Sequence, residues 1–340
     1  MSTRPRWKTL TVIAETGDRF ADFAPYVASI NDGGTVAFQA ALPQGGTGIF
    51  AGDGAELRML ADSRDGEFGE FYSHPDIAVS GVVSFYASLK SGERGVFRFD
   101  SNGIVAVGET PEQFSEIGPL GPTMNDAGMV AFRATAEAGG DGVFAGSSKD
   151  SVRLIGDTID VFSGFYGLPV VDHAGAVVFR ANLKDGGAGI YLDQVGAFSA
   201  IVETGELFTD LGAFPSLNNR GSVAFCGTLE TGGSGVFTST ACAISAVVDT
   251  RDPFESFRGA LINDHDEVIF YAVPHGGKLG IFAGPDPVHD QIVAIGDEIF
   301  GSAVSDLALN PVSFNNANQI AVRLKVADGR QFIVRAEPDG

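Results

Sequence analysis

Asn218-Asn219-Arg220-Gly221-Ser222-Val223-Ala224-Phe225 is one copy of a stretch that recurs along the whole chain. The last position of the stretch is occupied in turn by Phe38, Phe85, Phe132, Phe179, Phe225, Phe270 and Val322. Successive copies are 47, 47, 47, 46, 45 and 52 residues apart. A period of this length is typical of a modular array, in which each repeat is one supersecondary unit. We therefore expect residues 1–340 to form one domain of seven similar units.

Each unit is predicted to contain four short antiparallel strands. The strand that ends in Val-Ala-Phe is preceded by an Asn-x-x-Gly turn, because Asn and Gly tolerate a positive φ. Twelve residues after the Phe, a second strand carries Gly-Ile-Phe or a close variant, as in Gly48-Ile49-Phe50. Segments such as VAFQA and LRMLA are rich in branched and aromatic residues, which favour strands. No segment has a long helical period, and the fold class is therefore all-β.

The fourth strand of every unit ends in an acidic residue, followed by Thr or Ser in six units. A Phe comes a few residues later in all seven. We expect both to be structural, the carboxylates accepting backbone N–H groups of their own connections and the Phe rings filling the core. The acids are Glu15, Asp62, Glu109, Asp157, Glu203, Asp249 and Asp297, and the rings are Phe20, Phe68, Phe114, Phe162, Phe208, Phe254 and Phe300.

The order of the units predicts a closed ring. The seventh Asn and the segment that ends at Val322 lie near the C-terminus, with no fourth strand after them, whereas residues 9–14 at the N-terminus have no unit of their own. An N-terminal strand that completes the last unit closes many β-propellers and leaves no long sheet edge. We expect a seven-bladed β-propeller of four-stranded antiparallel blades, closed by this strand.

The motif at Asn31 to Phe38, Asn125 to Phe132 and Asn218 to Phe225 resembles bacterial proteins that carry tandem NxxGxxAF repeats. The chain also looks like a relative of TolB-like propellers, in which a turn precedes an Ile-Ala-Phe strand. The resemblance covers essentially the whole chain and implies a seven-bladed propeller. It implies no particular activity, because these proteins are largely uncharacterised.

Composition restricts the partners. With 22 Lys and Arg against 43 Asp and Glu, the formal net charge is −21, which argues against nucleic acid or an anionic membrane. The N-terminal segment has no apolar stretch typical of a signal peptide, and no membrane-spanning stretch follows. The expectation is a soluble, cytoplasmic protein and, by default, a monomer. Cys226 and Cys242 are expected to be buried free thiols.

Function is expected where the repeat is broken. Tyr26, Tyr72, Tyr166, Phe214 and Arg258 occupy equivalent upper positions of the first strand in five units, which predicts an aromatic channel mouth with one cation. Such a lining suits a small molecule, glycan or peptide. His74, two residues from Asp76, is predicted to project to the same side of its strand, and His275 can reach the same mouth from a neighbouring loop. The predicted ligand-binding residues are Tyr26, Tyr72, His74, Tyr166, Phe214, Arg258 and His275.

Three function classes remain open. The leading one is a binding protein that uses this mouth. The second is an enzyme of hydrolase, lyase or transferase type, with His74 as base, Asp76 as its orienting partner and Arg258 stabilising negative charge. The third is a protein-interaction platform. No nucleophile elbow, phosphate loop or zinc signature is present; a metal remains unassigned, and a structural calcium ion is allowed but not required.

Overall fold

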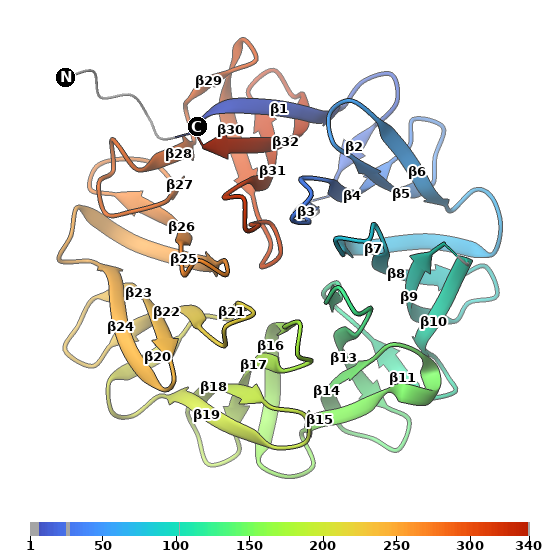
Figure 1. Ribbon diagram of the computed structural model, residues 1–340, viewed down its shortest axis with the longest axis horizontal. Coiled ribbons are helices and arrows are strands. Elements are labelled where there is room, and N and C mark those ends of the chain that lie inside the picture. Colours follow the sequence, from blue (N-terminus) through green and yellow to red (C-terminus); the bar gives the residue numbers. More distant parts are fainter. Residues whose placement is uncertain (1–6, 25–27, 102, 339–340) are drawn as a thin grey trace.

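The computed structural model describes residues 7–24, 28–101 and 103–338. Seven antiparallel sheets stand around a central axis, as Figure 1 shows, and the predicted seven-bladed propeller is confirmed. The described residues contain one helical turn, the 3-10 element η1 (Lys149–Ser151). None of their helices is long and apolar enough to cross a membrane.

Within a blade we letter the strands A to D from the axis outward. Blade 1 consists of β2 (Asp22–Phe23), β3 (Ser29–Ile30), β4 (Val36–Ala41), β5 (Thr47–Gly52) and β6 (Leu57–Asp62). Blade 2 consists of β7 (Phe68–Ile77), β8 (Val83–Leu89), β9 (Arg94–Asp100) and β10 (Gly103–Glu109). Blade 3 consists of β11 (Phe114–Ile117), β12 (Thr123–Met124), β13 (Val130–Ala136), β14 (Asp141–Gly146) and β15 (Arg153–Asp157).

The remaining blades repeat this order. Blade 4 consists of β16 (Phe162–Val171), β17 (Val177–Leu183), β18 (Ala188–Asp193) and β19 (Phe198–Glu203). Blade 5 consists of β20 (Phe208–Leu211), β21 (Ser216–Leu217), β22 (Val223–Leu229), β23 (Ser234–Thr240) and β24 (Ala243–Asp249). Blade 6 consists of β25 (Phe254–Ile262), β26 (Val268–Pro274), β27 (Gly280–Phe282) and β28 (Gln291–Ala294).

Blade 7 joins the two ends of the chain. It consists of β29 (Glu298–Ile299), β30 (Ser302–Ala308), β31 (Ile320–Val326), β32 (Gln331–Pro338) and β1 (Trp7–Glu15). β1 runs antiparallel to β32, with Trp7 opposite Pro338 and Glu15 opposite Phe332. Figure 1 shows β1 lying along β32 at the rim. The predicted closure by the N-terminal strand is therefore confirmed.

Three aromatic rings form the centre of each of the first six blades. The motif Phe of strand B stacks on the aromatic ring of strand C, with centroids 5.6–6.2 Å apart. The third ring, from the Phe that follows each D strand, meets the strand C ring edge-on at 4.8–5.2 Å. In five blades this Phe is the first residue of strand A, so strand A is longer than the sequence suggests.

The residues between strands D and A are tied to their own blade. In six blades the hydroxyl of the Thr or Ser after the acid accepts a backbone N–H at the start of strand C, at 2.8–3.2 Å. Asp62, Asp157 and Asp249 accept backbone N–H groups of their own connections, as expected. The longer glutamates instead meet side chains: Arg330 with Glu15, Lys149 with Glu109, and Tyr191 with Glu203.

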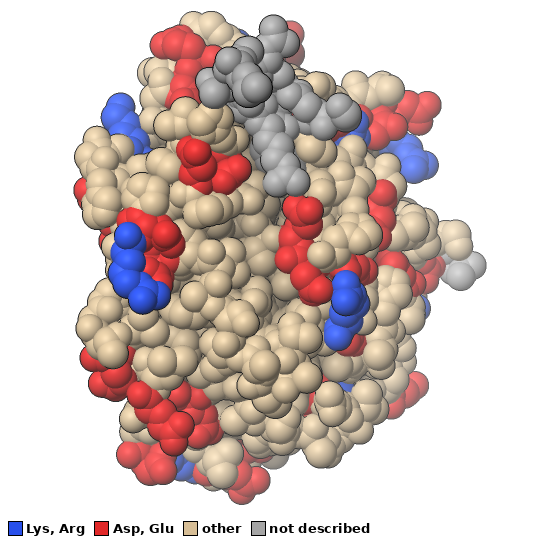
Figure 2. All heavy atoms as spheres, turned by 60° about the vertical axis from the view of Figure 1, so that its left-hand side comes forward, with Lys and Arg blue, Asp and Glu red and all other residues tan. Residues whose placement is uncertain are grey.

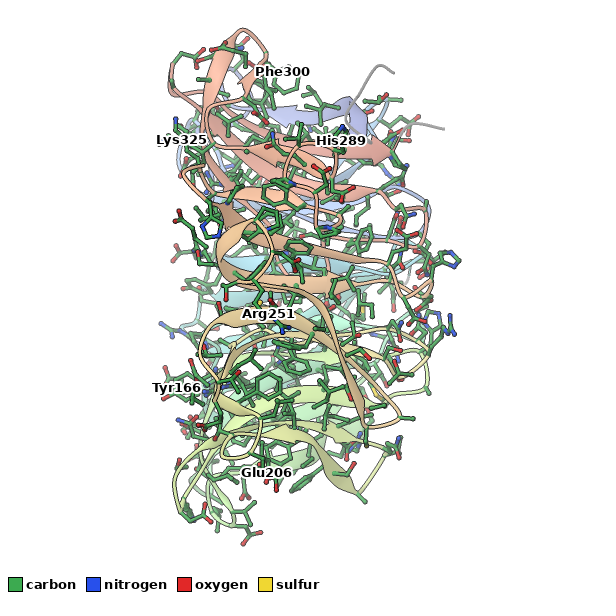
Figure 3. The ribbon with its side chains drawn as sticks, turned by 90° about the vertical axis from the view of Figure 1, so that its left-hand side faces the viewer. Tyr166, Glu206, Arg251, His289, Phe300 and Lys325 are labelled. Atoms are coloured by element: carbon green, nitrogen blue, oxygen red, sulfur yellow. The ribbon has the colours of Figure 1, made fainter. Side chains whose placement is uncertain are left out.

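Because neighbouring strands of a blade run in opposite directions, their connections lie alternately on two different faces of the disc. The AB face carries the turns between strands A and B and the hairpins between C and D. The BC face carries the hairpins between B and C and the connections from D to the next A. Figure 3 shows Tyr166 of β16 and Lys325 of β31 together at the BC face. Both cysteines are free, but only Cys226 is buried; Cys242 is exposed, because it lies in a C–D hairpin instead of a strand.

Candidate functional site at the BC face of the channel

A cavity of about 350 Å³ opens at the BC end of the channel. Its walls come mainly from the A strands and the loops that follow them in blades 2 to 7. Most of the lining side chains are apolar, while a few polar and charged groups reach the same space. The lining residues are Ser73, His74, Leu120, Leu168, Phe214, Arg258, Gly259, Ala260, Leu261, Tyr271, Asp306, Leu307, Ala308, Leu309, Asn310, Pro311 and Arg323.

His74 reaches this cavity because strand β7 is irregular. The pairing of β7 with β8 shifts between Tyr72 and Asp76, and Ser73 has a φ of +59°. A Cβ atom at Gly121 of blade 3 would lie 2.7 Å from Nδ1 of His74, so only glycine allows this close contact. The N–H of Gly121 donates to Oγ of Ser73 at 2.9 Å. The bulge and the neighbouring glycine together hold the imidazole in place.

The imidazole of His74 is buried and has an unused polar atom. Its side chain is 1% exposed, and burial lowers its pKa to about 4, although a hydrogen bond from the ring to the backbone carbonyl of Pro122 partly counteracts this. Nδ1 lies 3.4 Å from Oγ of Ser73, whereas Nε2 has no hydrogen-bond partner within the described residues. A buried polar atom without a partner is costly in a folded protein. Because the one N–H of the neutral ring is donated to Pro122, Nε2 of His74 is available to a bound molecule as an acceptor.

Asp76 belongs to the opposite end of the channel. Its side chain lines a second cavity, at the AB end of the channel, and not the BC cavity. Its two carboxylate oxygens accept the N–H groups of Ile77 at 2.7 Å and Met124 at 2.6 Å, while burial raises its pKa to about 7. No hydrogen bond links it to His74 in the described part of the chain. The expected same-side pair is absent, because the bulge at Ser73 breaks the alternation of the strand.

Two guanidinium groups contribute charge to the BC cavity. Arg258 lies on β25 beside a second register shift and is exposed; its side chain has no ion pair within residues 7–24, 28–101 and 103–338. Arg323 of β31 is 4% exposed and donates from Nη2 to Asp306 at 2.7 Å, while its Nε has no partner among the described residues. The cavity thus holds two cations and one carboxylate. The outer surface differs, since Figure 2 shows more Asp and Glu than Lys and Arg on the face it presents.

The other predicted binding residues are dispersed. Phe214 lines the cavity with 39% of its surface exposed, but Tyr72 is half-buried, lies beneath Arg94 and donates to Ser88 at 3.3 Å. Tyr166 is 49% exposed outside the cavity, with the Arg180 guanidinium 4.6 Å from its ring. His275 lies outside it as well, 3.8 Å from Glu255. Tyr26 lies outside the described residues.

Tyr271 and Arg323 also line the cavity, although neither was predicted from the sequence. Each directly follows the repeated Phe position, at Phe270 and Val322. The equivalent residues in the other blades are Gln39, Tyr86, Arg133, Arg180 and Cys226. A variable residue beside an invariant one was the available signal. The repeated Phe packs inside the blade, and the next residue on the strand points to the opposite side. The prediction considered only the first strand of each unit and therefore did not include this position.

The AB end of the channel has a smaller cavity, of about 140 Å³, lined mainly by the motif asparagines and the residues beside them. The carboxylates there are already used between blades. Asp32 accepts the N–H of Asn316 at 2.9 Å, Asp126 that of Val79 at 2.6 Å and Asp264 that of Asn219 at 2.7 Å. Across the described chain no three His, Cys, Asp or Glu side chains are grouped as around a metal ion. The BC cavity is therefore the candidate site.

A model of one protein family matches residues 16–332, and its description is "Family of unknown function (DUF7453)". No curated protein matches the chain.

Several solved structures have a similar fold. An oligogalacturonate lyase from Vibrio parahaemolyticus superimposes with a TM-score of 0.58 and 10% identity, over 97% of this chain and 98% of that one. A puromycin-hydrolysing peptidase from Mycobacterium tuberculosis gives a TM-score of 0.60 and 12% identity, over 98% of this chain and 55% of that one. An acylaminoacyl peptidase from Pyrococcus horikoshii gives a TM-score of 0.55 and 11% identity, over 90% of this chain and 49% of that one. At these identities the likeness shows the fold alone.

Proposed function

The chain belongs to this family of unknown function, and from its own site we propose that it is a binding protein whose BC cavity takes a small organic molecule. The single observation that carries the proposal is a cavity with mostly apolar walls that His74 and Arg258 both line. Neither Nε2 of His74 nor the guanidinium of Arg258 has a partner in the described chain. Apolar walls supply contact area, and a few placed polar groups orient the ligand.

The volume and the lining agree with such a ligand. Small-molecule sites commonly measure about 300–1,000 Å³, and this cavity is at the small end, with about 350 Å³. Leu120, Leu168, Leu307 and Leu309 provide apolar surface on several sides, and Phe214 stands at the rim. These features favour a compact molecule over a long glycan or peptide, which would need a groove.

Binding is better supported than catalysis. The expected base and its orienting carboxylate line different cavities. A His74 with a pKa of about 4 is a weak base at neutral pH, since general bases work best when their pKa is near the working pH. The lyase and peptidase structures with a similar fold are only 10–12% identical to this chain, so their activities are not carried over.

A screen with a blocked cavity tests the proposal. A library of small organic molecules is screened by thermal shift, because a ligand that binds only the folded state raises Tm by mass action. Gly259→Trp is expected to abolish the shifts, since a Cβ at Gly259 meets nothing closer than Tyr271 at 3.7 Å and the indole can fill the cavity.

Gly164→Trp is the matched control. Gly164 also lies on an A strand and is half-buried, and a Cβ added there would meet only Tyr166, at 3.8 Å, but it does not line the cavity. It should keep every shift. Ligands that stabilise both Trp variants as well as the unsubstituted protein bind elsewhere, and that result contradicts the proposal.

A further inference from the structure

Positive charge in the BC cavity is only partly balanced. Its charged lining residues are Arg258, Arg323 and Asp306. Asp306 is bound to Arg323 at 2.7 Å and is half exposed, which leaves Arg258 without a counter-charge among the described residues. The whole chain has a net charge of −21, so the two arginines in this lining, against one carboxylate, give the cavity the opposite sign of charge.

A second group points to the same conclusion through its hydrogen bonding. Arg323 is 4% exposed and lines the cavity, and one of its terminal nitrogens donates to Asp306 at 2.7 Å. Its Nε has no partner in the described part of the chain. A buried N–H without an acceptor is costly in a folded protein, and an anion in the cavity would supply one.

We infer, on the basis of the proposed function, that the ligand is a small organic carboxylate, held through its anionic oxygens by Arg258, with Arg323 nearby in the same lining. A guanidinium presents paired N–H groups whose geometry matches a carboxylate, and such charge-assisted bonds are stronger than neutral ones. The carbon skeleton of the ligand then packs against Leu120, Leu168 and Leu309. An alcohol or amide of the same skeleton can fill the apolar part but leaves Arg258 without an anion.

Matched acid and amide pairs test this inference. The probes are carboxylic acids with four to ten carbons, linear and aromatic, each paired with its carboxamide, and binding is measured by titration calorimetry. The acids are expected to bind about tenfold or more tightly than their amides, as a charged hydrogen bond replaces a neutral one. Arg258→Gln should remove this difference.

Arg58→Gln is the control for charge. Arg58 is exposed on β6, the outermost strand of blade 1, and does not line the cavity, so its loss changes the net charge equally but should keep the preference for acids. Circular dichroism checks that both arginine variants fold.

The outcomes separate the inference from the proposed function. If acids and amides bind equally and Gly259→Trp blocks both, the carboxylate inference is wrong but the binding function stands. The same holds if Arg258→Gln and Arg58→Gln weaken the acids to the same extent. If neither an acid nor an amide binds, and the wider library yields no shift that Gly259→Trp abolishes, both are wrong.

Discussion

At the scale of single residues, the motif asparagines serve two blades at once. Oδ1 of Asn125 accepts the N–H of Met129 in its own turn at 3.0 Å, and Nδ2 donates to the carbonyl of Asp172 in the next blade at 2.8 Å. Asn31, Asn218, Asn263 and Asn315 make the same bond to the following blade at 2.8–3.3 Å. Sequence patterns explain the turn, but the tie between blades depends on the ring and was not foreseen.

Blades 2 and 4 lack this donor for different reasons. Blade 2 has Ala78 at the position, and Asp76 instead accepts the N–H of Met124 in blade 3. Blade 4 has Asp172, whose Oδ1 accepts the N–H of Ala176 at 2.8 Å but which cannot donate as a carboxylate. Asp76, predicted as a catalytic partner, is thus explained by a structural role that replaces a missing asparagine.

Asp172→Asn should stabilise the protein. The new amide can donate to the carbonyl of Asn218, as its counterparts do, and one net hydrogen bond contributes about 0.5–1.5 kcal/mol. Burial raises the pKa of Asp172 above its ordinary value of 3.8. Below pH 3.8 the side chain is protonated in the folded and the unfolded protein, and it then lowers the free energy of unfolding least. As the pH rises the buried group ionises and the loss of stability grows. Urea denaturation should show a larger gain at pH 7 than at pH 4.

The converse substitution is the control. Asn125→Asp removes the donor to Asp172 and should lower the free energy of unfolding at pH 7. An Asp172→Asn protein no more stable than the unsubstituted one at either pH would contradict this account of the ties.

At the scale of strands and blades, aromatic packing explains the composition. Each of the first six blades uses three rings, which accounts for much of the total of 27 Phe. The stacked rings of strands B and C were predictable as core from their repetition. The bulge in β7 was not predictable, because its φ of +59° falls on Ser73, a residue type that does not signal a left-handed conformation. Blade 4 has the same register shift, with Gly167 at the equivalent position. The bulge in β7 decides where His74 and Asp76 point.

Phe208→Ala should weaken blade 5 strongly. The ring is fully buried, with the rings of Phe225 and Phe237 at 5.6 and 4.9 Å, and large-to-small changes of buried Phe cost about 3–5 kcal/mol. Phe214→Ala, at a ring that is 39% exposed, should cost within about 1 kcal/mol, closer to a surface substitution. Equal losses in guanidinium denaturation would show that the ring triad is not the centre of the blade.

At the scale of the whole molecule, closure depends on one strand. β1 supplies the outer strand of blade 7 and pairs with β32 over its length. Arg330 of the β31–β32 turn adds a contact with Glu15 at 3.1 Å. Without β1, the inner strand β32, in which Phe332, Ile333 and Val334 are buried, would become the edge of blade 7. Other chains can pair with such an apolar edge.

Deletion of residues 1–15 should therefore lower Tm and cause association that increases with protein concentration. Differential scanning calorimetry and size-exclusion chromatography measure the two effects. Deletion of residues 1–6 keeps β1, which begins at Trp7, and serves as the control. If the shorter deletion destabilises the protein as much as the longer one, closure by β1 is not the source of the loss.

The sequence by itself determined the number of blades, their four-strand order and their closure, because each blade repeats the same local pattern of turn, strand and Phe. It also singled out His74, Phe214 and Arg258, since departures from a repeat are visible without coordinates. Only the tertiary structure decided that these three share a cavity with Tyr271 and Arg323, whereas Asp76 ties two blades at the other end. Cavities and ties between blades are formed by residues far apart in the chain, and their positions depend on ring geometry and on a local bulge that no single repeat encodes.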